Sequence, residues 1–180
     1  MFLWRAKQTE ADLFIVATNK CQSDCVIQLV PKTEQEFQTY LKEGTARYAE
    51  ANVKAGYWKK TEALKKSIEA HNQLLPLGLA TPRHHLFTIT TDNKKSVGTI
   101  WIAEDHRSKT PIGFIYDLFI KEPYRGKGLA TQAMLLLEEK AKQLDLKVLY
   151  LRVFAFNTNA KNLYEKLGYQ ITSMNMAKQL

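Results

Sequence analysis

The chain has 180 residues, of which 45% are hydrophobic and 24% are charged, a composition typical of one globular domain with a sizeable core. No apolar run approaches the ~18 residues of a membrane helix, and no apolar stretch follows Arg5 and Lys7 as in a signal peptide, which predicts a cytoplasmic protein without a membrane partner. The net charge of +8 comes from 26 basic and 18 acidic residues scattered along the chain, which favours a solvated surface over a nucleic-acid site and also suits a phosphate-rich cofactor.

The N-terminal segment carries few structural signals. Residues 13–17 form an apolar run that is compatible with a strand, and a polar turn follows it. The next apolar run, over 26–30, predicts a short strand that ends at Pro31. We therefore assign residues 1–24 to an N-terminal extension without an assigned role and residues 25–180 to a single domain.

A capping box marks the start of the first predicted helix. Glu36 lies three residues after Thr33, the spacing at which each side chain reaches the other residue's backbone N–H. The apolar side chains that follow recur at helical spacing: Phe37, Tyr40, Leu41 and Tyr48. A second helix is predicted over about 60–75, before a proline- and glycine-containing loop at 76–82. The side chains expected on one face of this second helix are Leu64, Ile68 and His71.

From residue 85 onward the pattern changes to strands alternating with helices. Runs rich in β-branched and aromatic residues predict strands over 86–89, 97–102, 113–120, 148–154 and 169–176. The first two of these runs flank a polar turn, as in a hairpin. Helical spacing of apolar residues predicts helices over 130–144 and 160–167, the second ended by Gly168. This order predicts a mixed α/β fold in which helices cover a central twisted sheet.

A glycine-containing loop, Pro123–Ala130, lies between a predicted strand and a predicted helix. The first turn of a helix offers unpaired backbone N–H groups and the positive end of the helix dipole to an anion. Gly126 and Gly128 lack Cβ, so a phosphate can approach the main chain closely. A P-loop would need Gly-x-x-x-x-Gly-Lys-Ser/Thr, and a dinucleotide fingerprint would need a glycine where Thr131 stands. The loop alone therefore fits another kind of phosphate site or a tight strand-to-helix turn.

Two motifs in the second half of the chain carry a family resemblance. Arg125, Gly128 and Ala130 match the pattern Gln/Arg-x-x-Gly-x-Gly/Ala. Residues 157–169 match Asn-x-x-Ala-x-x-Leu-Tyr-x-x-x-Gly-Phe/Tyr. With both motifs in this order, the chain resembles the GNAT N-acetyltransferase superfamily over residues 26–180.

The resemblance implies a branch and a fold. Segments 79–86 and 114–117 are similar to the small bacterial YycN-like branch of the superfamily. The superfamily fold is α/β, with a mixed, mostly antiparallel twisted sheet, a splay between its central strands, and helices on its flanks. We expect this fold class here.

The resemblance also implies an acetyl-CoA site built largely from backbone groups. The strand before the loop is expected to pair with the pantetheine arm through Leu118, Phe119 and Ile120. Asn157 matches a side chain that holds the cofactor near its thiol end. The residues expected at the pyrophosphate are Arg125, Gly126, Lys127, Gly128, Leu129, Ala130 and Thr131. No metal is implied, and the two cysteines are not spaced as a zinc site.

Tyr164 and Asp117 are the expected catalytic residues. Tyr164 matches the general acid that protonates the departing thiolate, and a phenol with a pKa near ~10 stays protonated until that thiolate forms. A buried tyrosine that anchors its helix is the alternative. Some relatives carry a glutamate base where Arg152 stands, so Asp117 is our candidate for orienting the amine or relaying its proton through water. Alternatively, this carboxylate accepts backbone hydrogen bonds at the splay.

His84, His85 and Tyr116 are expected to face the acceptor. The resemblance implies an amine of a small molecule or of a peptide, which attacks acetyl-CoA directly in a ternary complex. An ordinary polar strand edge is the alternative for the two histidines. The rival function is a catalytically silent sensor that binds acyl-CoA, whereas the basic–aromatic interleaving of nucleic-acid binders is missing. A homodimer is compatible with these expectations.

Overall fold

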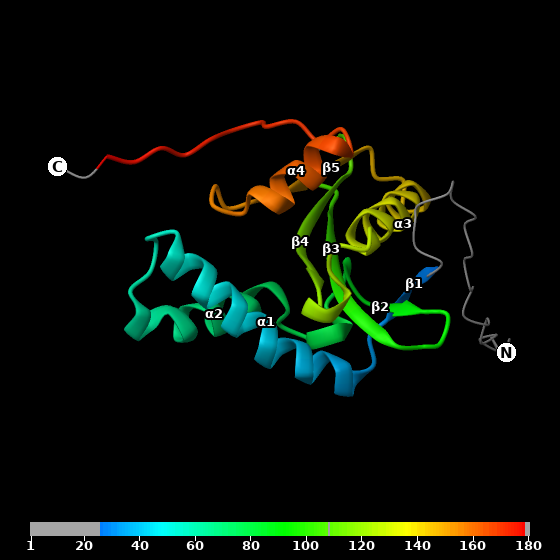
Figure 1. Ribbon diagram of the computed structural model, residues 1–180, viewed down its shortest axis with the longest axis horizontal. Helices are drawn as coiled ribbons and strands as arrows, with labels where there is room; N and C mark the ends of the chain where they lie inside the picture. Colours follow the sequence, from blue (N-terminus) through cyan, green and yellow to red (C-terminus); the bar gives the residue numbers. More distant parts are fainter. Residues whose placement is uncertain (1–25, 108, 179–180) are drawn as a thin grey trace, which may run out of the picture.

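The structure, a computed structural model, describes residues 26–107 and 109–178, and these centre on one five-stranded sheet (Figure 1). The strands follow chain order across the sheet: β1 (Ile27–Pro31), β2 (His84–Thr91), β3 (Ser96–Asp105), β4 (Ile112–Ile120) and β5 (Val148–Leu151). Neighbouring strands are antiparallel except β4 and β5, which are parallel. The predicted hairpin and the mostly antiparallel mixed sheet are confirmed. The N-terminal extension, with the strand proposed at 13–17, lies outside the described residues.

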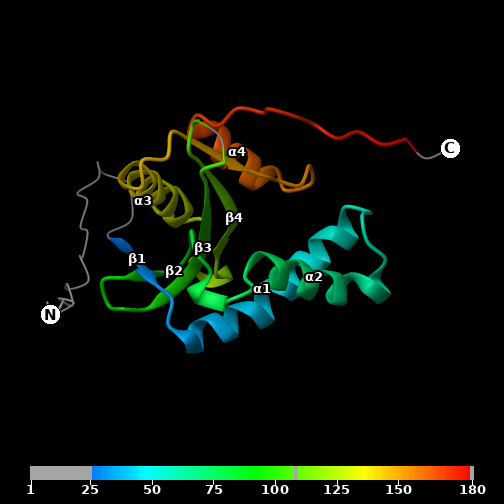
Figure 2. The same ribbon diagram turned by 180° about the vertical axis from the view of Figure 1, so that it is seen from behind.

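Helices cover both faces of this sheet. They are α1 (Glu34–Lys54), α2 (Lys60–Leu74), α3 (Leu129–Gln143) and α4 (Thr158–Lys166), with short 3₁₀ turns η1 (Gly78–Ala80) and η2 (Glu122–Tyr124). Helices α1 and α2 lie side by side on one face, α3 covers the other face, and α4 lies near β5 (Figures 1 and 2). The helical layers create two apolar cores, one on each side of the sheet.

The larger core lies between the sheet and α3. Among its fully buried side chains are Ile89, Ile100, Ile102, Met134 and Leu137. The smaller core joins α1 to the opposite face of the sheet through Phe37, Tyr40, Leu75, Leu86 and Trp101. Because each core uses one side of the strands, alternate residues of β3 serve opposite cores.

Helix α1 begins at the predicted capping box. The Glu36 backbone N–H donates to Thr33 Oγ1 at 3.3 Å, and the Thr33 N–H donates to Glu36 Oε2 at 2.9 Å. These two bonds satisfy N–H groups that have no acceptor within the helix.

Helix α2 is present as predicted, but its predicted buried face is partly wrong. His71 is buried, whereas Leu64 and Ile68 are 52% and 43% exposed. The small side chains of Ala63 and Ser67 face inward instead. They allow α2 to approach α1 so closely that Ser67 Oγ donates to the carbonyl oxygen of Thr45 at 2.7 Å. Close helix packing at this contact therefore outweighs the burial of larger side chains.

Strands β4 and β5 separate halfway along β4. Their pairing runs from Ile112 opposite Val148 to Ile115 opposite Leu151 and stops there. From that point to Ile120, β4 keeps only β3 as its strand partner. The expected splay is therefore present, and it lies between β4 and β5, the last strand of the described sheet.

A β-bulge lies in β4 at the start of this separation. Trp101 of β3 pairs with Asp117, and the next residue, Ile102, pairs with Ile115, so Tyr116 is an extra residue. An extra residue interrupts the regular alternation of a strand. As a result, Tyr116 and Asp117 both face the α1 side of the sheet, where both line the same pocket.

Two strand predictions near the C-terminus are wrong: one strand is shorter than predicted, and the other is absent. Strand β5 ends at Leu151 instead of 154, because residues 152–154 leave the sheet and line the pocket beside β4. The strand predicted over 169–176 is absent, and this segment has neither helix nor strand. It extends away from the body of the protein in both views (Figures 1 and 2), so no neighbouring strand is present to satisfy its backbone.

Lys32 directly follows β1, and its side chain is partly buried against β2 and β3. Its ammonium donates to Thr88 Oγ1 at 3.1 Å and to Thr99 Oγ1 at 3.0 Å. It also lies 5.4 Å from the centre of the Tyr40 ring. Burial lowers the pKa of Lys32 from 10.5 to about 8, although the nearby charge of Glu36 opposes this shift. The folded protein thus binds this proton more weakly than the unfolded chain does.

We therefore expect the free energy of unfolding to rise between about pH 8 and pH 10.5 through Lys32. In this window the unfolded chain retains a proton that the folded protein has lost, so higher pH favours folding. Replacing Lys32 with methionine should remove about 1–2 kcal/mol of that rise, after allowance for partial exposure. Urea unfolding of both proteins at pH 7.5 and pH 10.5 measures the difference, and parallel pH profiles would contradict it.

Candidate active site

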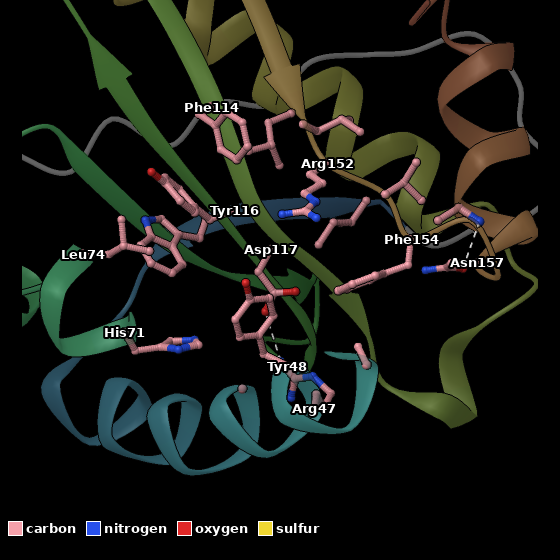
Figure 3. Close-up of a pocket in the computed structure, with 18 of the residues that line it drawn as sticks. Arg47, Tyr48, His71, Leu74, Phe114, Tyr116, Asp117, Arg152, Phe154 and Asn157 are labelled. Carbon is pink, nitrogen blue, oxygen red and sulfur yellow. Dashed lines mark hydrogen bonds and ion pairs between the residues drawn. The ribbon is translucent and has the colours of Figure 1, made fainter. Parts of the chain in front are cut away.

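The separation of β4 from β5 opens a pocket of about 420 Å³ against α1 and α2 (Figure 3). Its aromatic lining comprises Tyr40, Tyr48, Trp101, Phe114, Tyr116 and Phe154. Its charged lining residues are Arg47, Asp117 and Arg152. A cavity with apolar walls and a few charged groups is typical of a small-molecule site.

Asp117 is the acidic group of the pocket. Its carboxylate accepts a hydrogen bond from Arg47 Nη2 of α1 at 3.1 Å, and Tyr40 is a further hydrogen-bond partner. The side chain keeps 26% of its surface exposed, toward the pocket. Burial raises the pKa of Asp117, although the Arg47 charge opposes this rise. The partner of Asp117 is thus a side chain from another layer rather than the backbone at the splay.

Stacked rings form the wall around Asp117. The ring centres of Trp101 and Tyr116 lie 4.6 Å apart, and those of His84 and Tyr116 lie 6.0 Å apart. Trp101 Nε1 donates to His84 Nδ1 at 3.1 Å, so His84 carries its proton on Nε2 when neutral. Burial, followed by the charge of His85, lowers the pKa of His84. His84 thus supports the pocket wall from behind Trp101 and Tyr116.

His85 points to the opposite face of the sheet. It stacks on Phe87 of the α3-side core, and its Nε2 lies 2.6 Å from Glu104 Oε1. Glu104 also accepts from His106 at 2.7 Å. Burial tends to raise the pKa of Glu104, but the bonds from both histidines outweigh burial and lower it. Because consecutive residues of a strand face opposite sides, His84 and His85 cannot share one site, and we leave His85 out of the acceptor site.

Tyr164 and Asn157 close the pocket from α4. Both line the cavity. Burial, and then the negative charge of Asp117, raises the pKa of Tyr164 to about 12. Its phenol therefore keeps its proton at neutral pH. The Asn157 side chain accepts from the backbone N–H of Ala160 at 3.3 Å, which makes it the N-cap of α4.

The loop before α3 combines an open main chain with a free helix start. Gly126 and Gly128 have φ of 73° and 74°, a left-handed conformation that side chains with a Cβ disfavour. No atom lies within 4 Å of the position that a Cβ would take at Gly126. Gly128 is the N-cap of α3, so the N–H groups of Leu129, Ala130 and Thr131 have no acceptor within the helix. The arrangement suits a phosphate group.

The side chains of the loop before α3 make different contacts. Arg125 Nε donates to the carbonyl oxygen of Ile120 at 2.9 Å, and its guanidinium lies over the ring of Phe119. Arg125 thus fixes the loop against the end of β4. Lys127 lies over the ring of Tyr124. The Leu129 side chain is buried in the core, so this residue offers only its backbone to a ligand.

Several pocket residues were not predicted from the sequence. Arg47 lies 70 residues before its partner Asp117, so only the folded chain brings the two together. Its position seven residues after Tyr40 puts both on one face of α1, and this helical spacing was the available signal. Arg152 lines the pocket and stacks on Tyr57, with 5.5 Å from its guanidinium carbon to the ring centre.

Within residues 26–107 and 109–178, no helix is long and apolar enough to cross a membrane. The same residues contain no group of three histidine, cysteine or acidic side chains arranged to hold a metal ion.

Residues 47–169 match the acetyltransferase (GNAT) family. The uncharacterized N-acetyltransferase YycN of Bacillus subtilis (strain 168) is 42% identical over 154 residues, which cover 86% of this chain and 99% of YycN. The uncharacterized N-acetyltransferase YdgE of the same strain is 36% identical over 148 residues, or 82% of this chain and 94% of YdgE.

Solved structures show the same fold. The crystal structure of YycN from Bacillus subtilis superposes with a TM-score of 0.83 over 86% of this chain and 99% of that one. An acetyl transferase from Pyrococcus furiosus superposes with a TM-score of 0.63 at 23% identity, covering 87% of this chain and 100% of that one. The predicted similarity to the YycN-like branch is confirmed.

Proposed function

This chain belongs to the acetyltransferase (GNAT) family, and from that premise we propose that it transfers the acetyl group of acetyl-CoA to an amine held in the pocket between α1 and β4. The observation that carries the proposal is the meeting of two features at the splay. The pocket opens where β4 loses its β5 partner, and a protonated phenol, Tyr164, and a carboxylate, Asp117, both line it. An amine acceptor needs both a group that removes its proton and a group that returns one to the thiolate.

The residues at the splay fit acetyl-CoA. The unpaired edge of β4 beyond Ile115 can pair with an extended amide chain, as in strand addition. The open loop at Gly126 and the free N–H groups at the start of α3 suit a pyrophosphate. Bound acetyl-CoA would supply the thioester carbonyl that an amine attacks.

Two pocket residues would then carry out the two proton transfers of the reaction. Tyr164, whose pKa of about 12 lies above that of a thiol, would hold a proton until the thiolate takes it. Asp117 would orient the incoming amine and accept its proton through water, since burial has raised its pKa. Arg47 would fix the position of Asp117 rather than take part in proton transfer.

A screen of amines and peptides that follows free CoA tests this function, together with thermal unfolding in the presence of acetyl-CoA. Acetyl-CoA should raise the melting temperature, because it binds only the folded protein. Asp117→Asn should keep that thermal shift and lower kcat by about 10-fold or more with the best acceptor. An unchanged kcat in the folded variant would exclude Asp117 from the reaction, and the absence of a thermal shift would exclude the cofactor.

One observation favours the rival function of a silent acyl-CoA sensor. Asp117 already has two partners in Arg47 and Tyr40, which leave it less free to accept a proton than an unpaired carboxylate. A sensor would show tight acetyl-CoA binding and no CoA release with any amine in the screen. Turnover with any acceptor would exclude this rival.

The acceptor's chemistry is indicated by Arg152. This guanidinium points into the pocket (Figure 3) and has no carboxylate partner among the described residues. The other two charges of the pocket, Arg47 and Asp117, are paired with each other. The Arg152 charge is therefore not balanced by another charge of the pocket, which suits an amine that also carries a carboxylate.

Replacing Arg152 with glutamine should raise the KM of an amino-acid acceptor by about 10- to 100-fold, since a charge-assisted bond is lost. The KM of the matching amino-acid amide, which lacks the carboxylate, should change less than about 2-fold. Arg107→Gln is the matched control, because the side chain of Arg107 is 89% exposed, pairs with Asp105 and does not line the pocket. Equal effects on acid and amide would show that Arg152 does not bind a carboxylate.

A further inference from the structure

His71 is a buried, titratable side chain of the pocket to which the proposed reaction assigns no role. It lies in the last turn of α2, is only 7% exposed, and lines the same pocket as Asp117. Its ring points from α2 into the pocket (Figure 3). The ring centres of Tyr48 and Trp101 lie 5.9 Å and 6.0 Å from that of His71. Packing against these rings fixes the position of the imidazole.

One hydrogen bond decides which ring nitrogen of His71 carries the proton. Nδ1 lies 2.9 Å from the carbonyl oxygen of Ser67, one turn earlier in α2. A carbonyl oxygen only accepts, so Nδ1 is the donor and a neutral His71 has a bare Nε2. Ser67 is fixed in turn, because its Oγ donates to the carbonyl oxygen of Thr45 in α1 at 2.7 Å. The helix pair therefore holds His71 in the tautomer whose Nε2 can accept a proton.

Nε2 of His71 remains accessible to a ligand in the pocket. Within residues 26–107 and 109–178, no group forms a hydrogen bond with it. It is nevertheless not one of the fully buried polar atoms that lack a partner, so part of its surface is accessible on a side chain that lines the pocket. A base in this position can reach a bound amine directly or through one water.

The charged and titratable groups that face His71 come from α1 and β4. Helix α1 contributes Tyr40, Arg47 and Tyr48, and β4 contributes Asp117. Burial raises the pKa of Asp117, and the charges of Arg47 and of a protonated His71 oppose this rise. A protonated His71 and the Asp117 carboxylate therefore attract each other. The pocket thus has a place for an imidazolium as well as for a neutral imidazole.

We propose that His71 is a second proton acceptor in the reaction, and that its Nε2 removes the proton of the acceptor's ammonium group before the amine attacks. This inference rests on the acetyl transfer proposed above. An ordinary amine is mostly an ammonium ion at neutral pH and has no free lone pair until one proton leaves. The transfers assigned to Asp117 and Tyr164 both begin from the neutral amine, so that first proton needs an acceptor of its own.

The complete reaction then balances. An N–H bond of the ammonium breaks, and its proton converts His71 to an imidazolium. The free amine attacks the thioester carbon, so that a C–N bond forms and the C–S bond breaks. Asp117 takes the second proton from nitrogen, and Tyr164 gives its proton to the thiolate. The proton on Asp117 then restores the Tyr164 phenol through water, and the imidazolium releases its proton to solvent.

The two acceptors suit the two protons. An imidazole is a stronger base than a carboxylate. An ammonium holds its proton more tightly than the positively charged adduct that forms after attack, so the first proton needs the stronger base. Asp117 is also bound to Arg47 and Tyr40, whereas Nε2 of His71 has no partner among the described residues.

His71→Asn tests this role. The amide N–H of asparagine takes the place of Nδ1 and can keep the bond to Ser67, whereas nothing replaces Nε2. With the best acceptor of the amine screen, kcat/KM should fall by about 100-fold at pH 7. The loss should shrink by about 10-fold for each pH unit toward the acceptor's pKa, because the variant must use amine that is already neutral. The matched control, His106→Asn, should change little, since His106 pairs with Glu104 and does not line the pocket.

The pH dependence separates a base from a structural residue. A loss that is equal at every pH would show that His71 only supports the pocket, and a near-normal kcat/KM at pH 7 would exclude it altogether. Either result would overturn the proposal while the acetyl transfer itself stands. No CoA release by the unchanged protein with any amine would instead refute the proposed function, and this inference with it.

Nitrogen-15 NMR of the histidine rings gives a second test that does not depend on turnover. The signals that disappear in His71→Asn belong to His71. At about pH 8 we expect a protonated Nδ1 and a bare Nε2. A proton on Nε2 of the neutral ring would overturn the proposal, because that nitrogen could then not accept one.

Discussion

Removing the hydroxyl of Tyr164 by changing it to phenylalanine is expected to lower kcat by about 100-fold or more, with acetyl-CoA binding retained. The phenol faces the pocket and keeps its proton at neutral pH because burial raises its pKa to about 12. Its loss removes the group that would protonate the thiolate, and general-acid catalysis typically contributes on this scale. A 100-fold loss corresponds to about 2.7 kcal/mol of transition-state stabilisation.

Tyr169→Phe is the matched control for this variant. The ring centres of Tyr164 and Tyr169 lie 5.9 Å apart, but only Tyr164 lines the pocket. Each change removes one hydroxyl from the same cluster of rings, but the Tyr169 hydroxyl lies beside Glu138 and outside the pocket. Near-normal kcat for Tyr164→Phe, measured where chemistry limits the rate, would show that its ring is structural. A donor with a better leaving thiol should reduce the effect, since it needs less protonation.

Changing Gly126 to glutamate is expected to abolish the thermal shift that acetyl-CoA causes. At 100 times its dissociation constant, a ligand raises the free energy of unfolding by about 2.7 kcal/mol, and this whole increment should disappear. The carboxylate would occupy the open space above the main chain at residue 126 and repel a phosphate there.

Gly56→Glu separates this effect from backbone strain. Gly56 has φ of 76°, against 73° for Gly126, and no atom lies within 4 Å of its Cβ position either. Both variants should lose similar stability without ligand, since both force a side chain into a left-handed conformation. Only the change at residue 126 should remove the response to acetyl-CoA. A full response in folded Gly126→Glu would exclude the loop from cofactor binding.

The predictable parts of the fold depend on residues that lie close together in the sequence. The start of α1 follows from Thr33 and Glu36, three positions apart, and the hairpin of β2 and β3 follows from two strand runs around a polar turn. The site was predictable in part for another reason. The motifs around Arg125 and Asn157 resemble those of a known superfamily, and this resemblance predicts the loop and Tyr164 as site residues.

The remaining features arise from packing between distant segments. Ser67 rather than Leu64 faces inward because α2 approaches α1 closely, and periodicity alone does not report that distance. The ion pair of Arg47 with Asp117 joins two layers that are 70 residues apart in sequence. The segment at 169–176 has the composition of a strand, but it extends away from the sheet and pairs with none of the described strands.

The bulge at Tyr116 has a consequence for how this protein can vary. Ile115 and Leu118 would face opposite sides of a regular strand, yet both pack in the α3-side core because one extra residue lies between them. Tyr116 and Asp117 are therefore inserted into the pocket without removing any side chain from that core. Substitutions at 116 and 117 would alter the acceptor pocket and its chemistry, while 115 and 118 keep the packing of the α3-side core.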